Sequence, residues 1–402
     1  MDKNFINYHR PAIGTEEIRE VIACLKSGWL TTATRTKQFE ADFAKFADAK
    51  FAVAVNSCTA ALHLALEAVG IREGDLVIVP TMTFAATAEV VRYFNAIPVL
   101  VDVNEDDFCI DLDQAEDIIK RIKSREKVVG VPKKHNGVKA IIPVHYGGQP
   151  YDVNKCRKLC RKHGLFLIDD AAHVCPAYYK DEKGRWQYAG KGADIACYSF
   201  YANKTITTGE GGMATTDNQA WADRMRIMSL HGISKDAWKR FTKSGTWYYE
   251  IVAPGFKYNM TDIAASLGIH QLKKANKFMA ERKKLAEAYG KALKGTLGII
   301  LPKEKPGTKH SWHLYVIRID SAVTGIHRNK AYDKMKAAGI GCSVHYTPLH
   351  LHPYYRKKFG FKKGDFPVAE KLADQCLSMP LYPGLPRKSF QRIISTLKGI
   401  VK

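Results

Sequence analysis

Short apolar segments alternate with helical patterns through the first part of this 402-residue chain. Intervening segments, such as 83–93, 112–122 and 153–163, carry apolar residues at helical spacing. Strands that are apolar on both faces belong to a sheet covered on both sides, and regular alternation with helices makes such a sheet mainly parallel. The sequence therefore predicts an α/β fold around a mostly parallel sheet. The apolar segments are residues 51–55, 76–80, 98–102, 140–145, 165–168 and 195–200.

Small or charged side chains follow three of these predicted strands. Ser57 follows the first strand and opens a predicted helix, Asp170 follows 165–168, and Lys204 follows 195–200. Ligands on such sheets bind beyond the carboxyl ends of the strands, so we expect these residues to meet at one edge. The helix start at Ser57 predicts either an anion site or plain N-capping by Asn56 or Ser57.

Lys204 and Asp170 together supply what a pyridoxal phosphate (PLP) site requires. That cofactor needs a lysine to form a Schiff base and an acid to keep its pyridine nitrogen protonated. Each residue alone also has an ordinary explanation. Lysines after strands are commonly solvated, and an aspartate at a strand end commonly caps the next helix. The two residues by themselves leave these alternatives open.

The chain carries a net charge of +22 at neutral pH. Nucleic acid, an anionic membrane and small acidic substrates are all partners that such a charge attracts. The lysines are spread along predicted helices and loops, and no stretch interleaves arginines with aromatic residues. This distribution favours solvated faces with a contribution from acidic substrates, and it argues against nucleic acid as a partner.

Export, membrane and metal signals are not found in the sequence. No apolar run approaches the length of about 18 residues typical of a membrane span, and residues 1–10 lack an apolar core of the signal-peptide type. The nine cysteines are scattered, with neither Cys-x-x-Cys nor a metal-type cluster with histidine. We therefore expect reduced thiols, a cytoplasmic location, no membrane partner and no metal.

The pattern changes after Met260. A long helical stretch at 261–294 is followed by a loop at 302–308, an alternating strand at 310–320 and a helix at 330–338. A strand at 342–346 and a last helix complete a smaller α+β unit. We place the division near residue 262, with a large domain at 1–262 and a small C-terminal domain at 263–402.

Seven segments in order along the chain resemble the DegT/DnrJ/StrS family of PLP-dependent sugar aminotransferases, a branch of the fold-type I aminotransferases of the aspartate aminotransferase superfamily. Each segment alone is a weak signal, but seven in order at the family's spacing are hard to explain by chance. The resemblance implies a mixed, mostly parallel sheet in the large domain and a smaller α+β domain. The segments are residues 27–32, 56–62, 143–149, 168–173, 199–212, 255–260 and 345–350.

The resemblance implies a role for each of three catalytic residues. Lys204 would be the Schiff-base lysine and the acid–base group that moves the proton. Asp170 would pair with the pyridine nitrogen and keep the ring cationic. His173 would lie beside the cofactor's phenolic oxygen, at a position that is His or Gln in the family.

The resemblance also implies the residues that bind the cofactor's phosphate and ring. Ser199, with the backbone of Cys58 and Thr59, would hold the phosphate. Cys58 replaces a commoner Gly or Ala, which is harmless if only its N–H is used. Phe84 matches an aromatic position that stacks on the ring face, and a phenylalanine of the core is the alternative.

One departure from the family pattern concerns residues 255–259. Many members have Asn where this chain has Lys257, and that Asn reaches the phosphate from the partner subunit. Asn259 is two residues further on, on the same side of an extended segment. The resemblance therefore carries this contact to Lys257 or Asn259, and it implies a homodimer with shared active sites.

The implied reaction is a transamination from L-glutamate to a nucleotide-linked keto-sugar, a 4-keto-6-deoxyhexose, to make an amino sugar for surface polysaccharide or glycoconjugate biosynthesis. Dehydratases of a related branch have His in place of Lys204, which argues for transamination. His231, within the segment 231–238, and the loop residues His345 and Tyr346 would lie near the substrate, although packing is an alternative role for them. Two other functions stay open: an aminotransferase for a free keto-sugar or cyclitol, and a non-catalytic regulator that binds PLP or nucleic acid.

Overall fold

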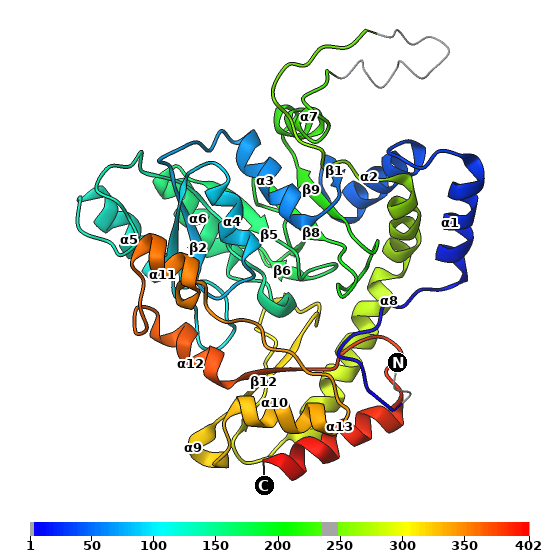
Figure 1. Ribbon diagram of the computed structural model, residues 1–402, viewed down its shortest axis with the longest axis vertical. Helices are drawn as coiled ribbons and strands as arrows, with labels where there is room; N and C mark the ends of the chain where they lie inside the picture. Colours follow the sequence, from blue (N-terminus) through cyan, green and yellow to red (C-terminus); the bar gives the residue numbers. More distant parts are fainter. Residues whose placement is uncertain (1–3, 235–247, 402) are drawn as a thin grey trace.

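A seven-stranded mixed sheet forms the centre of the large domain in the computed structural model, which describes residues 4–234 and 248–401 (Figure 1). The strand order is β1-β9-β8-β5-β4-β2-β3. The pairs β2–β3, β2–β4, β4–β5 and β5–β8 are parallel, whereas β9 runs antiparallel to both β1 and β8. The predicted mostly parallel sheet is confirmed. The strands are β1 (Phe51–Val55), β2 (Leu76–Pro80), β3 (Ile97–Val101), β4 (Val138–Ile141), β5 (Phe166–Asp170), β8 (Ile195–Ser199) and β9 (Gly212–Thr216).

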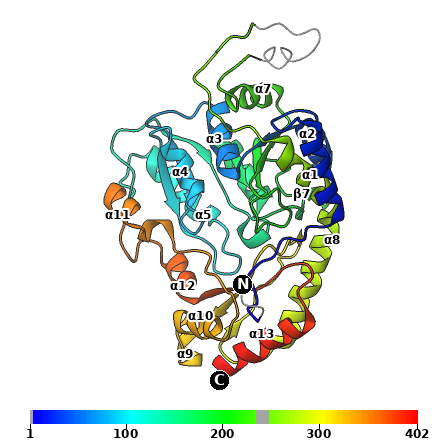
Figure 2. The same ribbon diagram turned by 45° about the vertical axis from the view of Figure 1, so that its right-hand side comes forward.

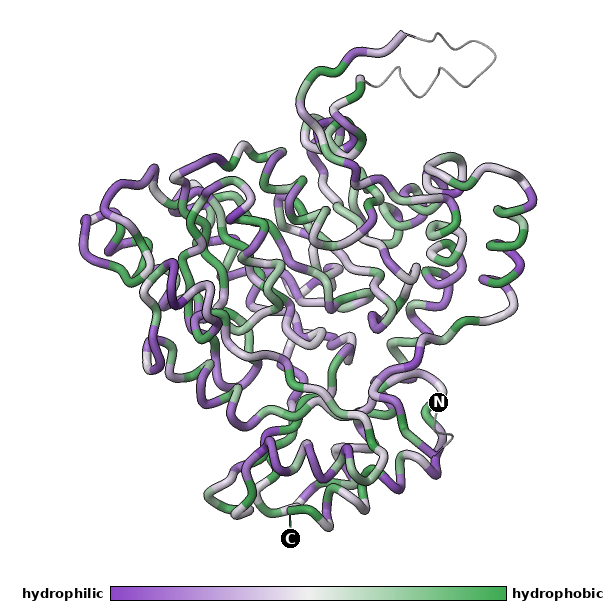
Figure 3. The backbone as a smooth tube through the Cα atoms, in the orientation of Figure 1, coloured by the Kyte–Doolittle hydropathy of each residue, from purple (hydrophilic) through white to green (hydrophobic). Residues whose placement is uncertain are grey.

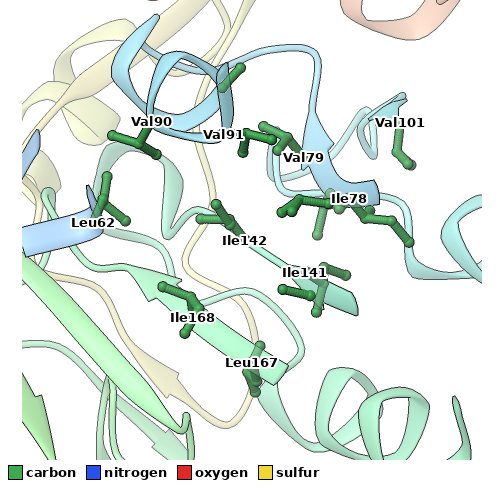
Figure 4. Packing of buried hydrophobic residues seen from close by; sticks show 14 of the residues in the cluster. Leu62, Ile78, Val79, Val90, Val91, Val101, Ile141, Ile142, Leu167 and Ile168 are labelled. Atoms are coloured by element: carbon green, nitrogen blue, oxygen red, sulfur yellow. The ribbon is translucent and has the colours of Figure 1, made fainter. Parts of the chain in front are cut away.

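Helices cover both faces of this sheet. Successive side chains of a strand point to opposite faces, so the alternate residues of β1 and β8 enter two different cores. The core that contains α3 takes Val53, Val55, Ile195 and Cys197. The core that contains α2 and α8 takes Ala52, Ala54, Ala196 and Tyr198. Figure 4 shows the larger core, where β2, β4 and β5 pack their Val, Ile and Leu side chains. The large-domain helices are α1 (Thr15–Ser27), α2 (Thr34–Phe46), α3 (Cys58–Ala68), α4 (Ala86–Arg92), α5 (Leu112–Lys123), α6 (Val153–His163) and α7 (Gln219–Met228), and the 3₁₀ turn η1 is Tyr146–Gly148.

Local capping explains where α6 begins and ends. The side chain of Asp152 accepts a hydrogen bond from the N–H of Lys155 at the start of this helix. Gly164 follows its last residue with φ of 68°, in the left-handed conformation that glycine adopts without steric cost. The predicted helices 112–122 and 153–163 are both confirmed.

The 32-residue helix α8 (Asp262–Leu293) runs from the large domain into the C-terminal part of the chain (Figure 2). Its first half packs against α1 and α2, while Ala286, Tyr289 and Leu293 belong to a separate core with the residues of β12 and α13. Ile6 of the N-terminal segment also joins this third core and forms a bridge with Ile340. The division near residue 262 remains a prediction.

The C-terminal part contains a small antiparallel sheet of order β10-β12-β13. A second small sheet, β11-β6-β7, joins β11 from this part of the chain to two strands of the large domain. The strands are β6 (Tyr178–Lys180), β7 (Trp186–Tyr188), β10 (Ile299–Ile300), β11 (Thr308–Lys309), β12 (Tyr315–Ile319) and β13 (Cys376–Met379). The helices are α9 (Ser321–Thr324), α10 (Arg328–Ala337), α11 (Pro353–Phe359), α12 (Pro367–Gln375) and α13 (Arg387–Ile400), with the 3₁₀ turn η3 at Leu349–Leu351.

Two predicted strands in this part of the chain are wrong in extent or kind. The strand expected at 310–320 begins only at Tyr315, because the backbone turns at Trp312, whose φ is 51°. The segment 342–346 is not a strand. Ser343 makes only a single bridge to Ser378 of β13, and β13 is the strand that pairs with β12.

None of the described helices combines the length and apolar character needed to cross a membrane. Within residues 4–234 and 248–401, no group of three or more His, Cys, Asp or Glu side chains is arranged to hold a metal ion. Hydrophilic segments lie on several sides of the molecule (Figure 3), in keeping with the wide spread of lysines along the sequence.

Candidate functional site

A cavity of about 330 Å³ opens at the carboxyl ends of β1, β2, β5 and β8. Nine of the twelve site residues expected from the sequence line it, and His345 and Tyr346 reach it from the small domain. The other seven are Cys58, Thr59, Phe84, Asp170, His173, Ser199 and Lys204. The topology of the sheet brings these residues together, because the carboxyl ends of parallel strands share one edge.

Lys204 lies in the turn that follows β8, and its backbone N–H donates to the carbonyl of Tyr201 at 2.9 Å. Its amine makes no hydrogen bond or ion pair with any residue that the structure describes. Burial lowers the pKa of Lys204 from 10.5 to about 8, while Cys58 and Asp170 act in the opposite direction. A lysine with a lowered pKa is partly neutral near physiological pH, which makes its amine a nucleophile.

Asp170 ends β5, and its carboxylate is 5% exposed. The hydroxyl of Thr87 donates to Oδ2 at 2.8 Å, and the N–H of Ala172 donates to Oδ1 at 3.2 Å. The hydroxyls of Thr87 and Thr83 lie 2.8 Å apart, so Thr83 is placed to donate to Thr87. Burial raises the pKa of Asp170, and the two donors and Lys204 oppose that effect by stabilising the charged form.

His173 is 4% exposed and is held at both ring nitrogens. The N–H of Gly147 donates to Nδ1 at 3.1 Å, and Nε2 lies 3.1 Å from the hydroxyl of Tyr346. Its ring packs against the ring of His313, with 4.5 Å between centroids. Burial and the charge of Lys204 lower the pKa of His173, so the imidazole is neutral.

The N-terminus of α3 forms one wall of the cavity. The side chain of Ser57 caps this helix by accepting from the N–H of Ala60, so the expected N-capping is present. Ser57, Cys58 and Thr59 also line the cavity, where the first N–H groups of a helix favour an anion. A Cβ on Gly212 would lie 2.4 Å from the carbonyl of Ser57, so only glycine lets β9 approach this turn.

Ser199 and Phe84 complete the cavity from two other strand ends. Ser199 ends β8, and its hydroxyl accepts from the N–H of Tyr201 at 3.3 Å. Phe84 follows β2 and is 61% exposed, so the alternative of a core phenylalanine is wrong. Its ring lies 6.2 Å from that of Tyr346 across the cavity, and stacking on a cofactor ring remains a prediction.

Three expected site residues do not line this cavity. Lys257 donates to Oδ1 of Asn259 at 2.6 Å, and the amide of Asn259 donates to the hydroxyl of Thr32 at 2.7 Å. His231 is exposed with φ of 57°, and its N–H donates to the carbonyl of Phe256 at 2.7 Å. Of the expected segment 231–238, residues 235–238 lie outside the described residues.

Sequence reasoning missed His313, Asn203 and Thr87. His313 and Asn203 line the cavity, and Nδ1 of His313 and Oδ1 of Asn203 are buried without a hydrogen-bond partner among the described residues. Thr87 holds Asp170 across 83 residues of sequence. In the sequence, only its position next to Lys204 points to Asn203 as a site residue. No local sequence pattern marks His313 or Thr87.

The residues present fit PLP. The cavity offers a lysine amine without a partner among the described residues, a buried carboxylate held by two donors, and a helix N-terminus for a phosphate. These groups match the three requirements of this cofactor, namely a lysine for the covalent bond, an acid for the pyridine nitrogen and an anion site for the phosphate.

Comparisons with known proteins agree with this geometry. A model of the DegT/DnrJ/EryC1/StrS aminotransferase family matches residues 11–398. The chain is 42% identical over 400 residues to the spore coat polysaccharide biosynthesis protein SpsC of Bacillus subtilis, covering 99% of this chain and 98% of SpsC.

Two solved structures extend the comparison to the fold. Spr1654 from Streptococcus pneumoniae in its PMP form matches with a TM-score of 0.86 and 32% identity, over 99% of this chain and 98% of that one. DesI, solved in the presence of its TDP-sugar product, matches with a TM-score of 0.83 and 26% identity, over 100% and 94% of the two chains. The chain belongs to the DegT/DnrJ/EryC1/StrS aminotransferase family, and it is a PLP-dependent sugar aminotransferase.

Proposed function

We propose that this enzyme transfers the amino group of L-glutamate to a nucleotide-linked keto-sugar, a 4-keto-6-deoxyhexose, for surface polysaccharide or glycoconjugate synthesis. The observation that carries the proposal is the cavity that unites the Lys204 amine, the Asp170 carboxylate and the N-terminus of α3. The name of SpsC and the TDP-sugar product of DesI support a nucleotide-linked substrate and a polysaccharide role. A net charge of +22 would help attract the diphosphate.

Lys204, Asp170 and the N-terminus of α3 would each have a separate role in this reaction. PLP, when bound, serves as the electron sink for the carbon that loses a proton. Nζ of Lys204 would anchor the cofactor, and an amine with a pKa of about 8 is suited to take up and return a proton near neutral pH. The carboxylate of Asp170, fixed by the hydroxyl of Thr87, would pair with the pyridine nitrogen and keep it protonated. The N–H groups at the start of α3 would hold the phosphate.

The experiment that tests this function uses glutamate labelled with nitrogen-15 and a panel of nucleotide-linked keto-sugars, with mass spectrometry of the products. We expect the label in an amino sugar that remains attached to its nucleotide, and no product from the Lys204→Ala variant. Free keto-sugars and cyclitols belong in the same panel, because amination of those compounds alone would contradict a nucleotide-linked substrate. Salt-sensitive DNA binding without any amino transfer would instead favour a regulator.

A homodimer with shared active sites is part of this proposal. Lys257 and Asn259 lie outside the cavity of their own chain, which suits a contact with the cofactor of a partner subunit. Apolar side chains are also exposed on α1, where Ile18, Ile22 and Leu25 are 54%, 45% and 52% exposed. Exposed apolar stripes of this kind are typical of interfaces.

The segment after α7 offers a second exposed apolar surface. Figure 1 shows the chain leaving the body of the molecule beyond α7, and Ile233 and Ile251 pair on the two sides of this projection. Ile251 and Val252 are 68% and 53% exposed. A second copy of the chain would cover both surfaces.

Mixing two inactive variants tests the shared site. Lys204→Ala removes the anchor, and a double variant with Lys257→Ala and Asn259→Ala removes the expected partner contacts. Subunit exchange should then create heterodimers with one intact site, and statistical mixing restores about a quarter of the wild-type activity. A monomer in sedimentation, or mixtures no more active than their components, would contradict shared sites.

We also propose a cytoplasmic location. All nine cysteines are free, and eight of them are buried. Reduced thiols of this kind suit a reducing compartment, and cell fractionation with an antibody against the chain would test the assignment.

A further inference from the structure

A hydrogen bond across the cavity joins a residue of the large domain to a residue of the C-terminal part. His173 follows β5, and Tyr346 lies in the loop before η3. The hydroxyl of Tyr346 lies 3.1 Å from Nε2 of His173, and other neighbours of His173 fix the orientation of the imidazole. The direction of this hydrogen bond decides what Tyr346 offers to a molecule in the cavity.

The backbone fixes that direction. The N–H of Gly147 points at Nδ1 of His173, and a backbone N–H can only donate. Nδ1 therefore carries no proton, and the neutral imidazole has its proton on Nε2. Because Nε2–H donates to Tyr346, the hydroxyl oxygen is the acceptor in this pair. The hydroxyl hydrogen of Tyr346 remains for another partner.

The position of His173 is set by tight packing around it. The hydroxyl of Ser311 donates to the carbonyl of His173 at 2.7 Å. A Cβ on Gly148 would lie 2.0 Å from that hydroxyl oxygen, so the turn at Gly147 and Gly148 needs glycine at the second position. The ring of His173 also packs against His313. The imidazole is thus held from the backbone, at both nitrogens and on one face.

Tyr346 has no acceptor for its own hydrogen among the described residues. Phe84, Tyr146 and His345 are its other aromatic neighbours, at 6.2, 6.3 and 4.9 Å between centroids. Burial raises the pKa of Tyr346, so its hydroxyl keeps its proton at every working pH. The residue lines the cavity that holds Lys204 and Asp170.

We propose that Tyr346 is the hydrogen-bond donor of this site, aimed by His173 at an oxygen of the bound cofactor or of the sugar. The inference rests on the proposed function and deepens it, because it gives the site a fixed donor for an acceptor oxygen. Two oxygens qualify by chemistry, namely the ring oxygen of PLP and a carbonyl or hydroxyl oxygen of the keto-sugar.

The test compares the wild-type holoenzyme with Tyr346→Phe in two measurements. In the first, the visible band of bound PLP is titrated with pH in the absence of substrate. A donor to the anionic ring oxygen stabilises its deprotonated form, so its loss should raise the midpoint by about one to two pH units. In the second, steady-state kinetics with the keto-sugar found in the panel should show KM raised about tenfold if the sugar oxygen is the acceptor.

Three further variants separate the hydrogen bond from general structural effects. Tyr289→Phe removes a buried hydroxyl that donates to the carbonyl of Pro380, remote from the cavity, and should change neither readout. His173→Gln keeps both an acceptor and a donor, whereas His173→Leu keeps neither. His173→Leu should shift the same quantity as Tyr346→Phe, either the pH midpoint of the PLP band or the KM for the sugar, and in the same direction. A protein that carries both substitutions should differ little from either single variant.

The two measurements also identify the acceptor. A shifted midpoint assigns Tyr346 to the cofactor, and a raised KM with an unchanged midpoint assigns it to the sugar. If both stay at the wild-type values, the inference is wrong while the aminotransferase function stands. If the wild-type enzyme moves no amino group from glutamate, the proposed function fails, and the titration alone still decides whether Tyr346 contacts PLP.

Discussion

The amine of Lys204 should titrate near pH 8 in the apoprotein, well below an ordinary lysine. Burial lowers its pKa from 10.5 to about 8. At pH 7.5 about a quarter of such amines are neutral, against about one in a thousand for a lysine with the ordinary pKa, a gain of about 200-fold in the reactive form. The structure thus predicts a lysine that is ready to bind PLP at physiological pH.

Limited labelling of the apoprotein with an amine-reactive reagent across pH 6 to about 11 measures this directly, with mass spectrometry of the Lys204 peptide. The solvent-exposed lysines of the same digest provide the internal reference. Asp170→Asn removes a negative charge that raises the pKa of Lys204, so this variant should titrate lower than the wild type. A wild-type midpoint at the ordinary value, or an upward shift in Asp170→Asn, would refute the reasoning.

Two further substitutions test how the site is held. Thr87→Val removes a hydrogen-bond donor from the buried Asp170 carboxylate and should raise the pKa of Asp170 further. A carboxyl group with a raised pKa makes the folded apoprotein less stable as the pH rises from about 4 through that pKa. The unfolding free energy that Thr87→Val loses relative to wild type should therefore grow with pH, whereas Thr87→Ser should behave as wild type. A difference that does not depend on pH would contradict the role of Thr87 as a donor to Asp170. Gly212→Ala places a Cβ 2.4 Å from the carbonyl of Ser57, so it should weaken PLP binding at least tenfold, as measured by spectroscopic titration. Gly290→Ala in α8, where the added Cβ meets open space, should leave PLP binding unchanged. If Gly212→Ala bound PLP as tightly as the wild type, the close packing of β9 against the start of α3 would be contradicted.

Much of the site follows from sequence because topology decides it. Regular alternation of strands and helices implies a parallel sheet, and the carboxyl ends of parallel strands share one edge. Ser57, Asp170 and Lys204 follow three such strands, so their meeting in one cavity is a consequence of chain order. The family resemblance was needed to tell this arrangement from a capped helix and a solvated lysine.

The remaining parts of the site depend on contacts between distant segments. Thr87 reaches Asp170, and Tyr346 reaches His173 across 173 residues of sequence, with no local pattern to reveal either pair. The sequence predicts a strand at 342–346, yet this segment makes only one bridge to β13, and β13 itself pairs with β12. The propensity of a short segment cannot show which competing segment pairs with β12, because that choice depends on packing of the whole small domain.

The central claim is that the amine of Lys204 carries the cofactor. Borohydride reduction of the holoenzyme fixes a PLP–lysine bond permanently, and peptide mass spectrometry then identifies the modified residue. We predict that the label lies on Lys204 and that the Lys204→Ala protein retains PLP only without a covalent bond, because Asp170 and the N-terminus of α3 still hold it. A label on another lysine, or reducible PLP with near-normal transamination in Lys204→Ala, would contradict the account.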